Sequence, residues 1–586
     1  MALMAKLILS FTGPMTVGEF ERQCRHPRAA QVELLRQILQ KNKDTVFGRK
    51  YGFSRIKTMR TFQKRVPIST YEDIKPFIDA ELRGKKGQLT AEKPILFALT
   101  SGTTGDAKYI PVTPECRKAK ADLMNVWLSA FFGEHPDIFS ERILSVVSPE
   151  MTERSPDGTP CGAESGHAYR NAPAPIRALY ACPYEVFEIE DYEARYYTVL
   201  RIAAAQSLSL IVTVNPSTIL ILCERLAKHT RAIIRDVREG GLSSDIPVPR
   251  RIREKIADWL VPNPARAEEL QGLAAQHNNT LAPRLIWPKL AAVACWQGGT
   301  VGEYIEKLKP YFPAKIPFRD IGYLASEHRG SVPLFDDTDA GVLAIATNVY
   351  EFFPADKKCK PRGSELLTVN NLKLNQRYYV YVTTRGGLYR YDMADIVEVV
   401  AYYQRTPMIR FVQKGKGIVS ITGEKLSEAQ VLEAVREAFG GVQGGYEFIS
   451  AVAQRACAPP RYVLLAEFVK PPAPSRLQKM VRAVDERLSA LNGEYASKRA
   501  SARLGPLSLR IVKRGEFDRY RRRKVSEGRA DSQFKILRVT DDECFANEFK
   551  IVREVELKSN SGAKPKRNVS SSRRSRLHFR KMRTIG

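Results

Sequence analysis

Short apolar runs that alternate with amphipathic helical patterns limit the folds open to this chain more than any other feature of its sequence. Strand-like runs lie at residues 143–147, 209–214, 291–295 and 341–347, and helical patterns lie among them at 116–132, 217–237 and 301–308. Such alternation is typical of α/β proteins with largely parallel sheets. At 586 residues the chain exceeds one ordinary domain, so we expect two or three.

The character of the chain changes near residue 413. Gly415, Gly417 and Gly423 cluster there, and a shorter, more basic block of strand and helix signals follows. We therefore predict an N-terminal domain over 1–413, a flexible join over 414–424, a C-terminal domain over 425–556 and a basic tail over 557–586. The tail is rich in serine and poor in apolar residues, which predicts disorder.

The net charge of +29 is large enough to suggest nucleic-acid binding. About a third of this surplus lies in the tail, where residues 558–586 include ten Lys or Arg and no acid. A second cluster, RYRRRK, occupies residues 519–524. Neither segment has the pattern of an RNA-recognition strand or a zinc finger. We expect no specific nucleic-acid partner, and nonspecific contact with polyanions is the alternative.

Cysteine and histidine are scattered along the chain. The nine cysteines include no C-x-x-C pair, and the seven histidines include no H-E-x-x-H motif. This spacing predicts neither a disulfide framework nor a zinc site. No run of about 18 uncharged apolar residues occurs, so we expect no membrane partner. The default expectation is a cytoplasmic monomer.

A glycine- and hydroxyl-rich loop is the strongest chemical signal. Residues 99–113 read LTSGTTGDAKYIPVT, in which Gly102 and Gly105 allow close approach of the backbone to an anion. Backbone N–H groups in such a nest bind phosphate oxygens, and nearby hydroxyls and Lys108 add donors. The loop is not a Walker A motif. Taken alone, its composition favours a surface Gly/Thr turn. The hydroxyl residues are Thr100, Ser101, Thr103 and Thr104.

The loop resembles the T-S-G-T-T-G-x-x-K phosphate loop of the acyl-adenylate-forming superfamily, which includes acyl-CoA synthetases and luciferases. Its extension KYIPVT, with NKDTVFGRKYGF at 42–53 and FQKRVPISTYEDIKPFI at 62–78, resembles one branch, the auxin-responsive acyl-acid amido synthetases (the Gretchen Hagen three family). The resemblance covers about residues 28–550. It implies a large N-terminal adenylate-forming domain of β-sheets flanked by helices, plus a smaller mobile α+β C-terminal domain. It also implies that Thr100–Gly105 and Lys108 hold ATP phosphates.

Two further blocks resemble the nucleotide-binding motifs of that family. In IGYLASEH at 321–328, the resemblance implies that Tyr323 stacks on adenine, Ser326 approaches the phosphates and Glu327 holds Mg²⁺. Leu324, Ala325 and His328 belong to the same nucleotide-binding motif. In GLYRYDMADIVEVV at 387–400, Asp395 would accept both ribose hydroxyls. Ala394 stands where the family usually has glycine, and its methyl group could restrict the turn.

Three lysines from the hinge onward complete the predicted site. FVQKGKGIVSITGEKLSE at 411–428 resembles the family hinge, which would place Lys414 near the ribose or phosphates and makes Lys425 a catalytic candidate. Gln533 to Lys535 resemble a Q-x-K element, whose lysine would approach the α-phosphate. The plain alternative for Lys535 is one more charge on a basic surface.

The implied reaction has two steps, with ATP and Mg²⁺ as cofactors. A carboxylic acid is converted to its acyl adenylate with release of pyrophosphate, and an amine, typically an amino acid, then displaces AMP to form an amide. Two alternatives remain: an acyl-CoA ligase that shares the first step, and a basic binding protein that has lost catalysis. The acyl pocket would lie between helix 116–132 and residues 295–299. Its wall residues would be Trp127, Phe131, Phe132 and Trp296, which are otherwise simply core.

Overall fold

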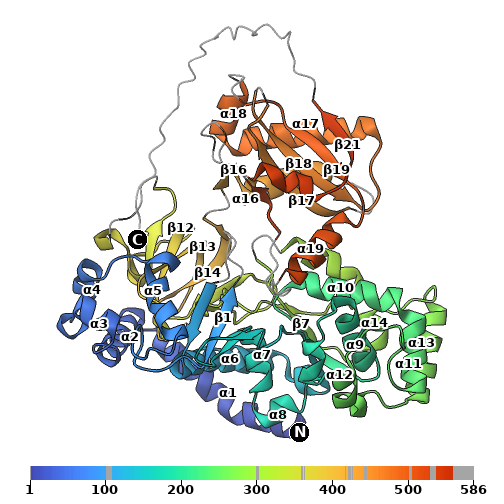
Figure 1. Cartoon of the computed structure of the whole chain (residues 1–586), viewed down its shortest axis with the longest axis horizontal. Helices are drawn as coiled ribbons and strands as arrows, with labels where there is room; N and C mark the ends of the chain where they lie inside the picture. The colour runs from blue at the N-terminus through green and yellow to red at the C-terminus, as the bar shows by residue number, and fades with distance from the viewer. Residues whose placement is uncertain are drawn as a thin grey trace, which may run out of the picture.

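The computed structural model describes most of the chain. The described residues are 2–100, 108–298, 302–357, 361, 363–415, 418–419, 421, 424, 426–440, 445–457, 459–500, 504–527, 536–540 and 542–557. Helices and sheets alternate through the first two thirds, and a second set of strands and helices follows from about residue 418 (Figure 1). This mixed architecture confirms the predicted α/β class.

A four-stranded parallel sheet forms one half of the N-terminal region, in the order β3-β6-β7-β8. Its strands have short, almost wholly apolar sequences, as expected of a parallel sheet covered on both faces. Three of the runs predicted from the sequence are strands of this sheet. The strands are β3 (Arg142–Ser145), β6 (Leu208–Val212), β7 (Ala292–Ala294) and β8 (Phe318–Arg319).

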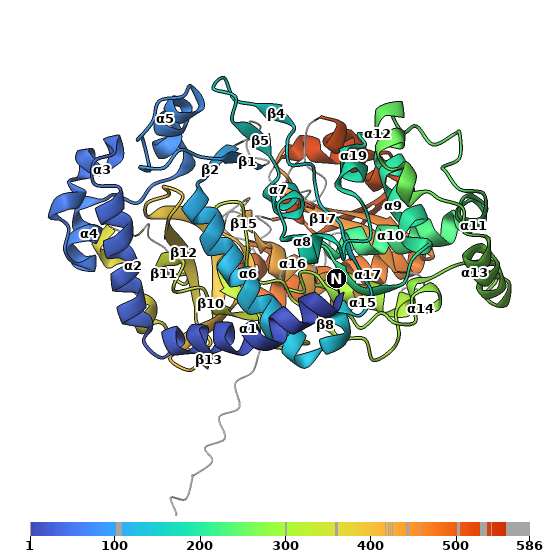
Figure 2. The same ribbon diagram turned by 90° about the horizontal axis from the view of Figure 1, so that it is seen from below.

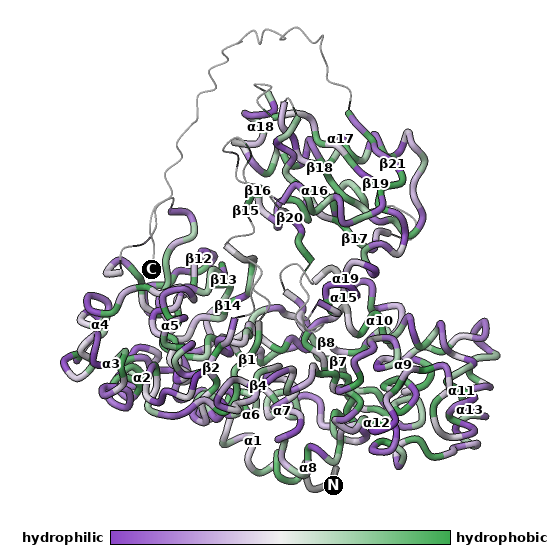
Figure 3. The backbone as a smooth tube through the Cα atoms, viewed as in Figure 1, coloured by the Kyte–Doolittle hydropathy of each residue, from purple (hydrophilic) through white to green (hydrophobic). Residues whose placement is uncertain are grey.

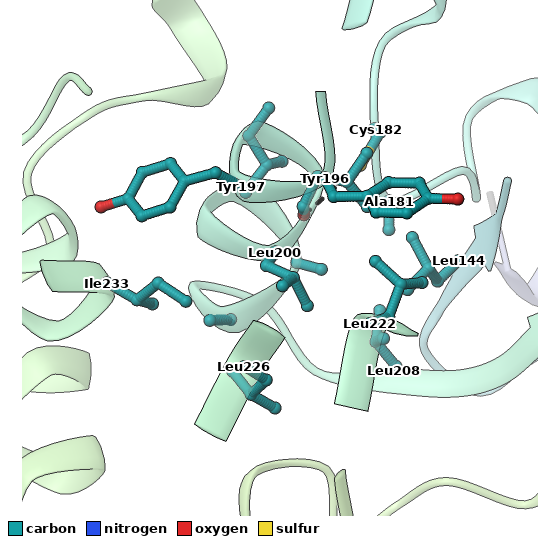
Figure 4. Close-up of a cluster of buried hydrophobic side chains, with 14 of the residues drawn as sticks. Leu144, Ala181, Cys182, Tyr196, Tyr197, Leu200, Leu208, Leu222, Leu226 and Ile233 are labelled. Atoms are coloured by element: carbon teal, nitrogen blue, oxygen red, sulfur yellow. Dashed lines mark hydrogen bonds between the residues drawn. The ribbon is translucent and has the colours of Figure 1, made fainter. Parts of the chain in front are cut away.

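Helices between these strands bury a large apolar core, in which Leu144, Leu200 and Leu226 lie among other buried side chains (Figure 4). The helix predicted over 217–237 is two helices that meet at His229. The Thr230 hydroxyl donates to the carbonyls of Leu226 and Ala227, which weakens helix continuity at this point. The helices are α9 (Tyr192–Ala204), α10 (Pro216–Lys228), α11 (Thr230–Glu239), α12 (Arg250–Lys255), α13 (Pro264–Gln276), α14 (Pro283–Ile286) and α15 (Glu303–Leu308).

A six-stranded sheet forms the other half, in the order β11-β12-β13-β14-β10-β9. Every pairing in it is antiparallel, so the prediction of largely parallel sheets is correct for the first sheet only. Antiparallel strands can be joined by a short loop, whereas parallel strands need a long crossover connection. The connections at 385–390 and 404–405 are too short for a crossover, so the strands that they join are antiparallel. The strands are β9 (Ser331–Val332), β10 (Ala340–Leu343), β11 (Asn348–Pro354), β12 (Arg377–Thr384), β13 (Tyr391–Tyr403) and β14 (Thr406–Lys414).

Among the N-terminal helices, those between residues 27 and 82 pack with a small sheet against this antiparallel sheet and share a core with it. The small sheet has the order β2-β1-β5-β4. Helix α1 runs along α6 at the lower side of the molecule (Figure 2). These helices are α1 (Ala2–Cys24), α2 (Pro27–Lys41), α3 (Val46–Tyr51), α4 (Met59–Arg65), α5 (Tyr71–Leu82), α6 (Pro114–Glu134), α7 (Glu164–Arg170) and α8 (Ala174–Arg177). The strands are β1 (Leu96–Thr100), β2 (Lys108–Val112), β4 (Glu153–Arg154) and β5 (Pro160–Gly162).

The C-terminal region has a five-stranded sheet of its own, in the order β20-β17-β18-β19-β21. Two clusters of buried apolar side chains include the strands of this sheet, and all of their members come from residue 419 onward. Hydrophobic stretches of its chain are green in Figure 3. A separate core is what an independent domain requires, although the boundaries at 413 and 424 stay predictions. The elements are β15 (Ile418–Val419), β16 (Leu426–Ser427), α16 (Glu428–Phe439), β17 (Tyr446–Gln454), β18 (Arg461–Phe468), α17 (Pro474–Leu491), α18 (Gly493–Ala500), β19 (Ser508–Val512), α19 (Glu516–Ser526), β20 (Val539–Thr540) and β21 (Ile551–Glu556).

Two further features concern the whole described chain. The eight cysteines within it are all free. None of the helices that the structure describes combines the length and apolarity needed to cross a bilayer.

Candidate active site

The predicted phosphate loop joins the two strands of a hairpin. Thr100 ends β1 and Lys108 begins β2, and the two residues pair directly across the hairpin. The Lys108 ammonium lies 5.3 Å from the centre of the Tyr71 ring. The pairing therefore brings Thr100 and Lys108 together at the end of the hairpin where residues 101–107 connect the two strands. Ser101, Gly102, Thr103, Thr104 and Gly105 lie outside the described residues.

Residues 323–329 form a tight turn shortly after β8. The Ala325 N–H donates to the carbonyl of His328 at 2.8 Å, and the His328 N–H donates back at 3.2 Å. Ser326 and Glu327 therefore occupy the tip of the turn, with Leu324 and Arg329 bridged below them. The carboxyl end of a parallel sheet is where α/β enzymes place their ligands. The predicted phosphate and Mg²⁺ residues lie at this end.

A hydrogen bond joins this turn to the antiparallel sheet. The Tyr323 hydroxyl donates to Asp395 Oδ2 at 2.7 Å, and both side chains are buried, with 8% and 2% of their surfaces exposed. Burial raises the pKa of the Tyr323 phenol well above its usual range, so the hydroxyl stays a donor at neutral pH. Asp395 in β13 is paired with Lys414 in β14, whose backbone alone is described. The structure thus brings together three residues that the sequence assigned to one nucleotide.

The backbone conformation of Ala394, the residue before Asp395, explains why the family usually has glycine at this position. Ala394 has a φ of 49°, in the left-handed region that disfavours a Cβ. Its N–H donates to Asp392 Oδ1 at 2.7 Å, and its carbonyl accepts from the Gly415 N–H at 2.7 Å. These bonds hold the turn in the conformation that glycine would adopt freely. Alanine therefore leaves the turn intact and adds backbone strain of about 1–2 kcal/mol.

Lys120 supports the Ser326 turn, and the sequence analysis missed it. Its ammonium donates to the Ser326 carbonyl at 2.9 Å and to Glu164 Oε2 at 2.7 Å. Burial acts to lower the pKa of Lys120, but the Glu164 carboxylate outweighs it and holds the pKa above its usual value. A signal existed: Lys120 falls within the stripe Cys116, Leu123 and Trp127, whose other members are buried apolar residues. A lysine within an apolar helix stripe is expected to be buried, and a buried cation requires an acidic or hydrogen-bonding partner.

A second polar contact lies beside the first between the same two helices. Arg117 of α6 lies 3.2 Å from His167 Nε2 of α7, and His167 Nδ1 lies 2.6 Å from Glu150 Oε1. Arg117 and Lys120 are three residues apart on α6, as are Glu164 and His167 on α7, so each pair shares a helix face. The two contacts fix α7 against α6 behind the Ser326 turn.

The aromatic residues proposed for the acyl pocket are mostly core. Trp127, Phe131 and Phe132 are buried in one cluster with β7 and β10. Both tryptophans bind the backbone that leads into the turn: Trp127 Nε1 donates to the Asp320 carbonyl and Trp296 Nε1 to the Gly322 carbonyl, each at 2.9 Å. The interpretation of these residues as core is therefore correct for the three on α6. Trp296 is half-buried.

The tip residue Glu327 fits the role of a Mg²⁺ ligand. Its half-buried carboxylate forms no hydrogen bond or ion pair with any other residue that the structure describes. A carboxylate with unused oxygens beside a phosphate site is the donor that Mg²⁺ prefers. A second set of potential ligands, Glu134, His135 and Asp336, is different, because the buried Arg319 guanidinium binds both of its carboxylates. The two carboxylates of that set therefore neutralise the charge of Arg319.

Two of the predicted catalytic lysines cannot be placed. Lys425 and Lys535 lie outside the described residues. The C-terminal region that carries them contacts the parallel-sheet half through polar groups. Arg522 lies 3.2 Å from Glu193 Oε1, and Lys307 donates to the Tyr446 carbonyl at 2.8 Å.

Comparison with known proteins places the chain in a family. Models described as the GH3 family N-terminal, central and C-terminal domains match residues 16–318, 341–414 and 429–543. The chain is 27% identical over 557 residues to the indole-3-acetic acid-amido synthetase GH3.17 of Arabidopsis thaliana, covering 87% of this chain and 90% of that protein. It is 26% identical over 557 residues to the jasmonoyl-L-amino acid synthetase JAR6 of Nicotiana attenuata, covering 92% and 95%.

Solved structures share the fold. The GH3.15 acyl acid amido synthetase superposes with a TM-score of 0.81 at 22% identity, covering 92% of this chain and 96% of that one. A 2-hydroxyisobutyryl-CoA ligase in its postadenylation state superposes with a TM-score of 0.50 at 14% identity, covering 88% and 90%. The matched domains extend over most of the chain in the expected order, and Thr100, Lys108 and Asp395 lie within them, whereas the turn at 323–329 lies between the first and the central domain. The chain belongs to the GH3 family.

Proposed function

We propose that this protein is an ATP-dependent ligase that activates a carboxylic acid as its acyl adenylate and transfers the acyl group to an amino acid. The observation that carries the proposal is the Tyr323–Asp395 contact at 2.7 Å, which joins the turn after the parallel sheet to the antiparallel sheet. The names of the curated relatives, which are amido synthetases, support an amine as acceptor.

In the first half-reaction, a carboxylate oxygen of the acid attacks the α-phosphorus of ATP and pyrophosphate leaves. Thr100–Gly105 and Lys108 would hold the phosphates, and Asp395 would accept the ribose hydroxyls. A carboxylate accepts up to about four hydrogen bonds, so Tyr323 can fix the orientation of Asp395 while the ribose binds. Mg²⁺ bound by Glu327 would supply neutralisation of phosphate charge. These residues act by positioning and by electrostatic stabilisation.

Lys120 has a positioning role in this step. It holds the carbonyl of Ser326 from beneath, so the tip of the turn is fixed before the nucleotide binds. Its charge, kept by Glu164, also lies near the Glu327 carboxylate. Fixing the tip reduces the reorganisation needed to bind Mg²⁺ and phosphates.

In the second half-reaction, the amine attacks the acyl carbonyl and AMP leaves. We assign Lys425 and Lys535 as the catalytic lysines that the C-terminal domain contributes to the two steps. Rotation of this domain about residues 414–424 would exchange the surface that faces the site between the steps. The polar contacts between this domain and α9, α10 and α15 are of a kind that such a rotation can break. A monomeric state and a cytoplasmic location belong to the same proposal.

Pyrophosphate release over a panel of carboxylic acids tests the proposal, with amino acids or coenzyme A as acceptors. We expect release that depends on an acid and on Mg²⁺, and an amide product only when an amino acid is supplied. Turnover with coenzyme A alone would identify an acyl-CoA ligase, whose fold is similar. The absence of pyrophosphate release with every acid would favour a binding protein that has lost catalysis.

A further inference from the structure

Arg329 is a buried cation that pairs with none of the carboxylates in the described part of the chain. It lies at the base of the Ser326–Glu327 turn and is 6% exposed. One of its nitrogens, Nη2, donates to the Ile321 carbonyl at 3.0 Å, and Nη1 lies 3.8 Å from the Met124 sulfur. Nε is buried and has no hydrogen-bond partner among the described residues. A guanidinium offers five N–H donors, and here one of them meets an oxygen.

Other buried arginines of this protein are satisfied differently. Arg390 donates to both oxygens of Glu351 and to three backbone carbonyls. Arg319 binds two carboxylates, as described above. Arg201 donates to three backbone carbonyls, although Nη1 of Arg201 and Nη1 of Arg319 have no partner among the described residues. Buried charges are normally paired or fully hydrogen-bonded, because desolvation is otherwise uncompensated. By this standard Arg329 lacks an anion.

The nearest acids influence Arg329 without binding it. Burial lowers the pKa of its guanidinium to about 10, and the carboxylates of Asp320 and Glu164 offset this only in part. Each acid is already engaged: Asp320 accepts from the backbone N–H groups of Gln297 and Gly322, and Glu164 accepts from Lys120. No described carboxylate therefore completes the coordination of Arg329.

The position of Arg329 connects it to the acyl substrate. Its neighbour Met124 is on α6, one turn beyond Lys120, whose ammonium donates to the Ser326 carbonyl. Met124 is 41% exposed, so the guanidinium lies one side chain from solvent. Glu327, two residues before Arg329, is at the phosphate end of the same turn. An acid with its reacting carboxylate at that end would extend its other end along α6.

We propose that Arg329 recognises a second anionic group on the acyl acid, so that the preferred substrates are dicarboxylic acids. This inference rests on the proposed adenylation of a carboxylic acid at the Glu327 end of the site. A guanidinium binds a carboxylate through two parallel, charge-assisted hydrogen bonds, which matches the donors that Arg329 has unused. A neutral chain end would leave these donors unpaired in a buried site.

Matched acids test the proposal. ATP–pyrophosphate exchange is measured with benzoate against 1,3- and 1,4-benzenedicarboxylate, and with hexanoate against adipate. We expect the wild-type kcat/KM to favour at least one dicarboxylate over its monoacid by about 10- to 100-fold, the range for a hydrogen-bonded charge. Arg329→Met, of similar volume and neutral, should lose that preference while its monoacid rate changes little. Arg329→Lys should retain part of it.

Direct binding separates this inference from the adenylation proposal. Calorimetric titration without ATP should show the preferred dicarboxylate binding to the wild type and not to Arg329→Met. If no acid supports exchange yet this difference persists, the proposed function fails and the anion site stands. Arg201→Met controls for the loss of a buried arginine: it should lower stability and leave the diacid-to-monoacid ratio unchanged. Equal use of monoacids and diacids by the wild type, an equal loss of both in Arg329→Met, or no dicarboxylate binding would overturn the inference.

Discussion

The two large sheets of the N-terminal region contribute to one site by different means. The parallel sheet ends in a turn, residues 323–329, whose tip is held from outside by Lys120 of α6. The antiparallel sheet places Asp395 within a long strand, where a left-handed residue and a paired strand fix it. One half of the site is thus supported by side chains, and the other half by backbone.

This difference has energetic consequences. A side-chain support fails when one atom group is removed, because the partners remain buried and unsatisfied. A backbone support tolerates side-chain changes but carries strain, as Ala394 does. We therefore expect substitutions at Lys120 to alter function strongly and substitutions at Ala394 to alter mainly stability.

The largest effect is expected where the two halves meet. Asp395→Ala should lower acid-dependent pyrophosphate exchange by about 10³-fold or more, because the buried carboxylate that we propose as the ribose acceptor is lost. It also removes the acceptor of the Tyr323 hydroxyl and should lower the free energy of unfolding by about 1–3 kcal/mol. Exchange kinetics and thermal denaturation measure the two effects separately.

Tyr323→Phe is the matched control for Asp395→Ala. It removes the same hydrogen bond and keeps the carboxylate, so exchange should fall by only about 10-fold through poorer orientation. Wild-type activity in Asp395→Ala, with the protein folded, would refute the ribose assignment and with it the meeting of the two halves.

The next effect concerns the side-chain support. Lys120→Met leaves the Ser326 carbonyl and the Glu164 carboxylate without their donor. We expect kcat to fall about 10- to 100-fold, the KM for ATP to rise, and the free energy of unfolding to drop by about 1–3 kcal/mol. Lys120→Met combined with Glu164→Gln should regain part of the stability, because no uncompensated charge remains, but not the activity.

The pH dependence of this support follows from the direction of the Lys120 pKa shift. Because its folded pKa is raised, the stabilisation is fully present below the unfolded pKa of 10.5 and is lost as pH rises through the folded value. The stability difference between wild type and Lys120→Met should therefore stay constant from about pH 6 to 9 and shrink only in stronger alkali. A difference that changes within pH 6–9 would show that another group controls the turn.

The sequence identified the motifs in both halves of the candidate site but not the side chain that supports the turn. Asp395 and the Glu327 turn belong to short contiguous motifs, and their neighbours on the chain set their geometry. Lys120 lies about 200 residues before Ser326, so only packing brings them together. Its position in an apolar stripe was a visible signal, but its partner could not be named without the fold.

The direction of strand pairing was also only partly predictable from the sequence. The apolar runs at 209–214 and 291–295 are separated by helices, and the prediction of parallel pairing was correct there. The strands from residue 377 onward also carry apolar runs, and only the short connections between them indicate hairpins. The Tyr323–Asp395 bond crosses between these sheets, so neither motif alone revealed that the two residues touch.

A smaller effect is expected at the contact of the C-terminal region, which reaches the parallel-sheet half through α9 and α10. Arg522→Ala removes the 3.2 Å contact with Glu193 and should change the free energy of unfolding by less than about 1 kcal/mol, because the pair is partly exposed. Its effect on turnover should be larger with an amine acceptor than in exchange, because the proposed domain rotation would break the contact. Comparing both rates at low and high salt measures this, and Arg250→Ala, at an exposed intrahelical pair, is the control. Equal effects on both rates would show that the contact does not restrain the rotation.

The smallest effect is expected from Ala394→Gly, which isolates the strain of the backbone support. Removing the strain of the left-handed alanine should raise the free energy of unfolding by about 1–2 kcal/mol. The greater conformational freedom of glycine in the unfolded chain offsets about 0.5–1 kcal/mol of this gain. The net expectation is a gain of about 0.5 kcal/mol, visible as a small rise in Tm with exchange kinetics unchanged. Ala394→Val, which adds a branched side chain at the same φ, should destabilise by more than the glycine stabilises. A loss of stability in Ala394→Gly would mean that the alanine methyl group packs usefully, and that both halves of the site depend on side chains after all.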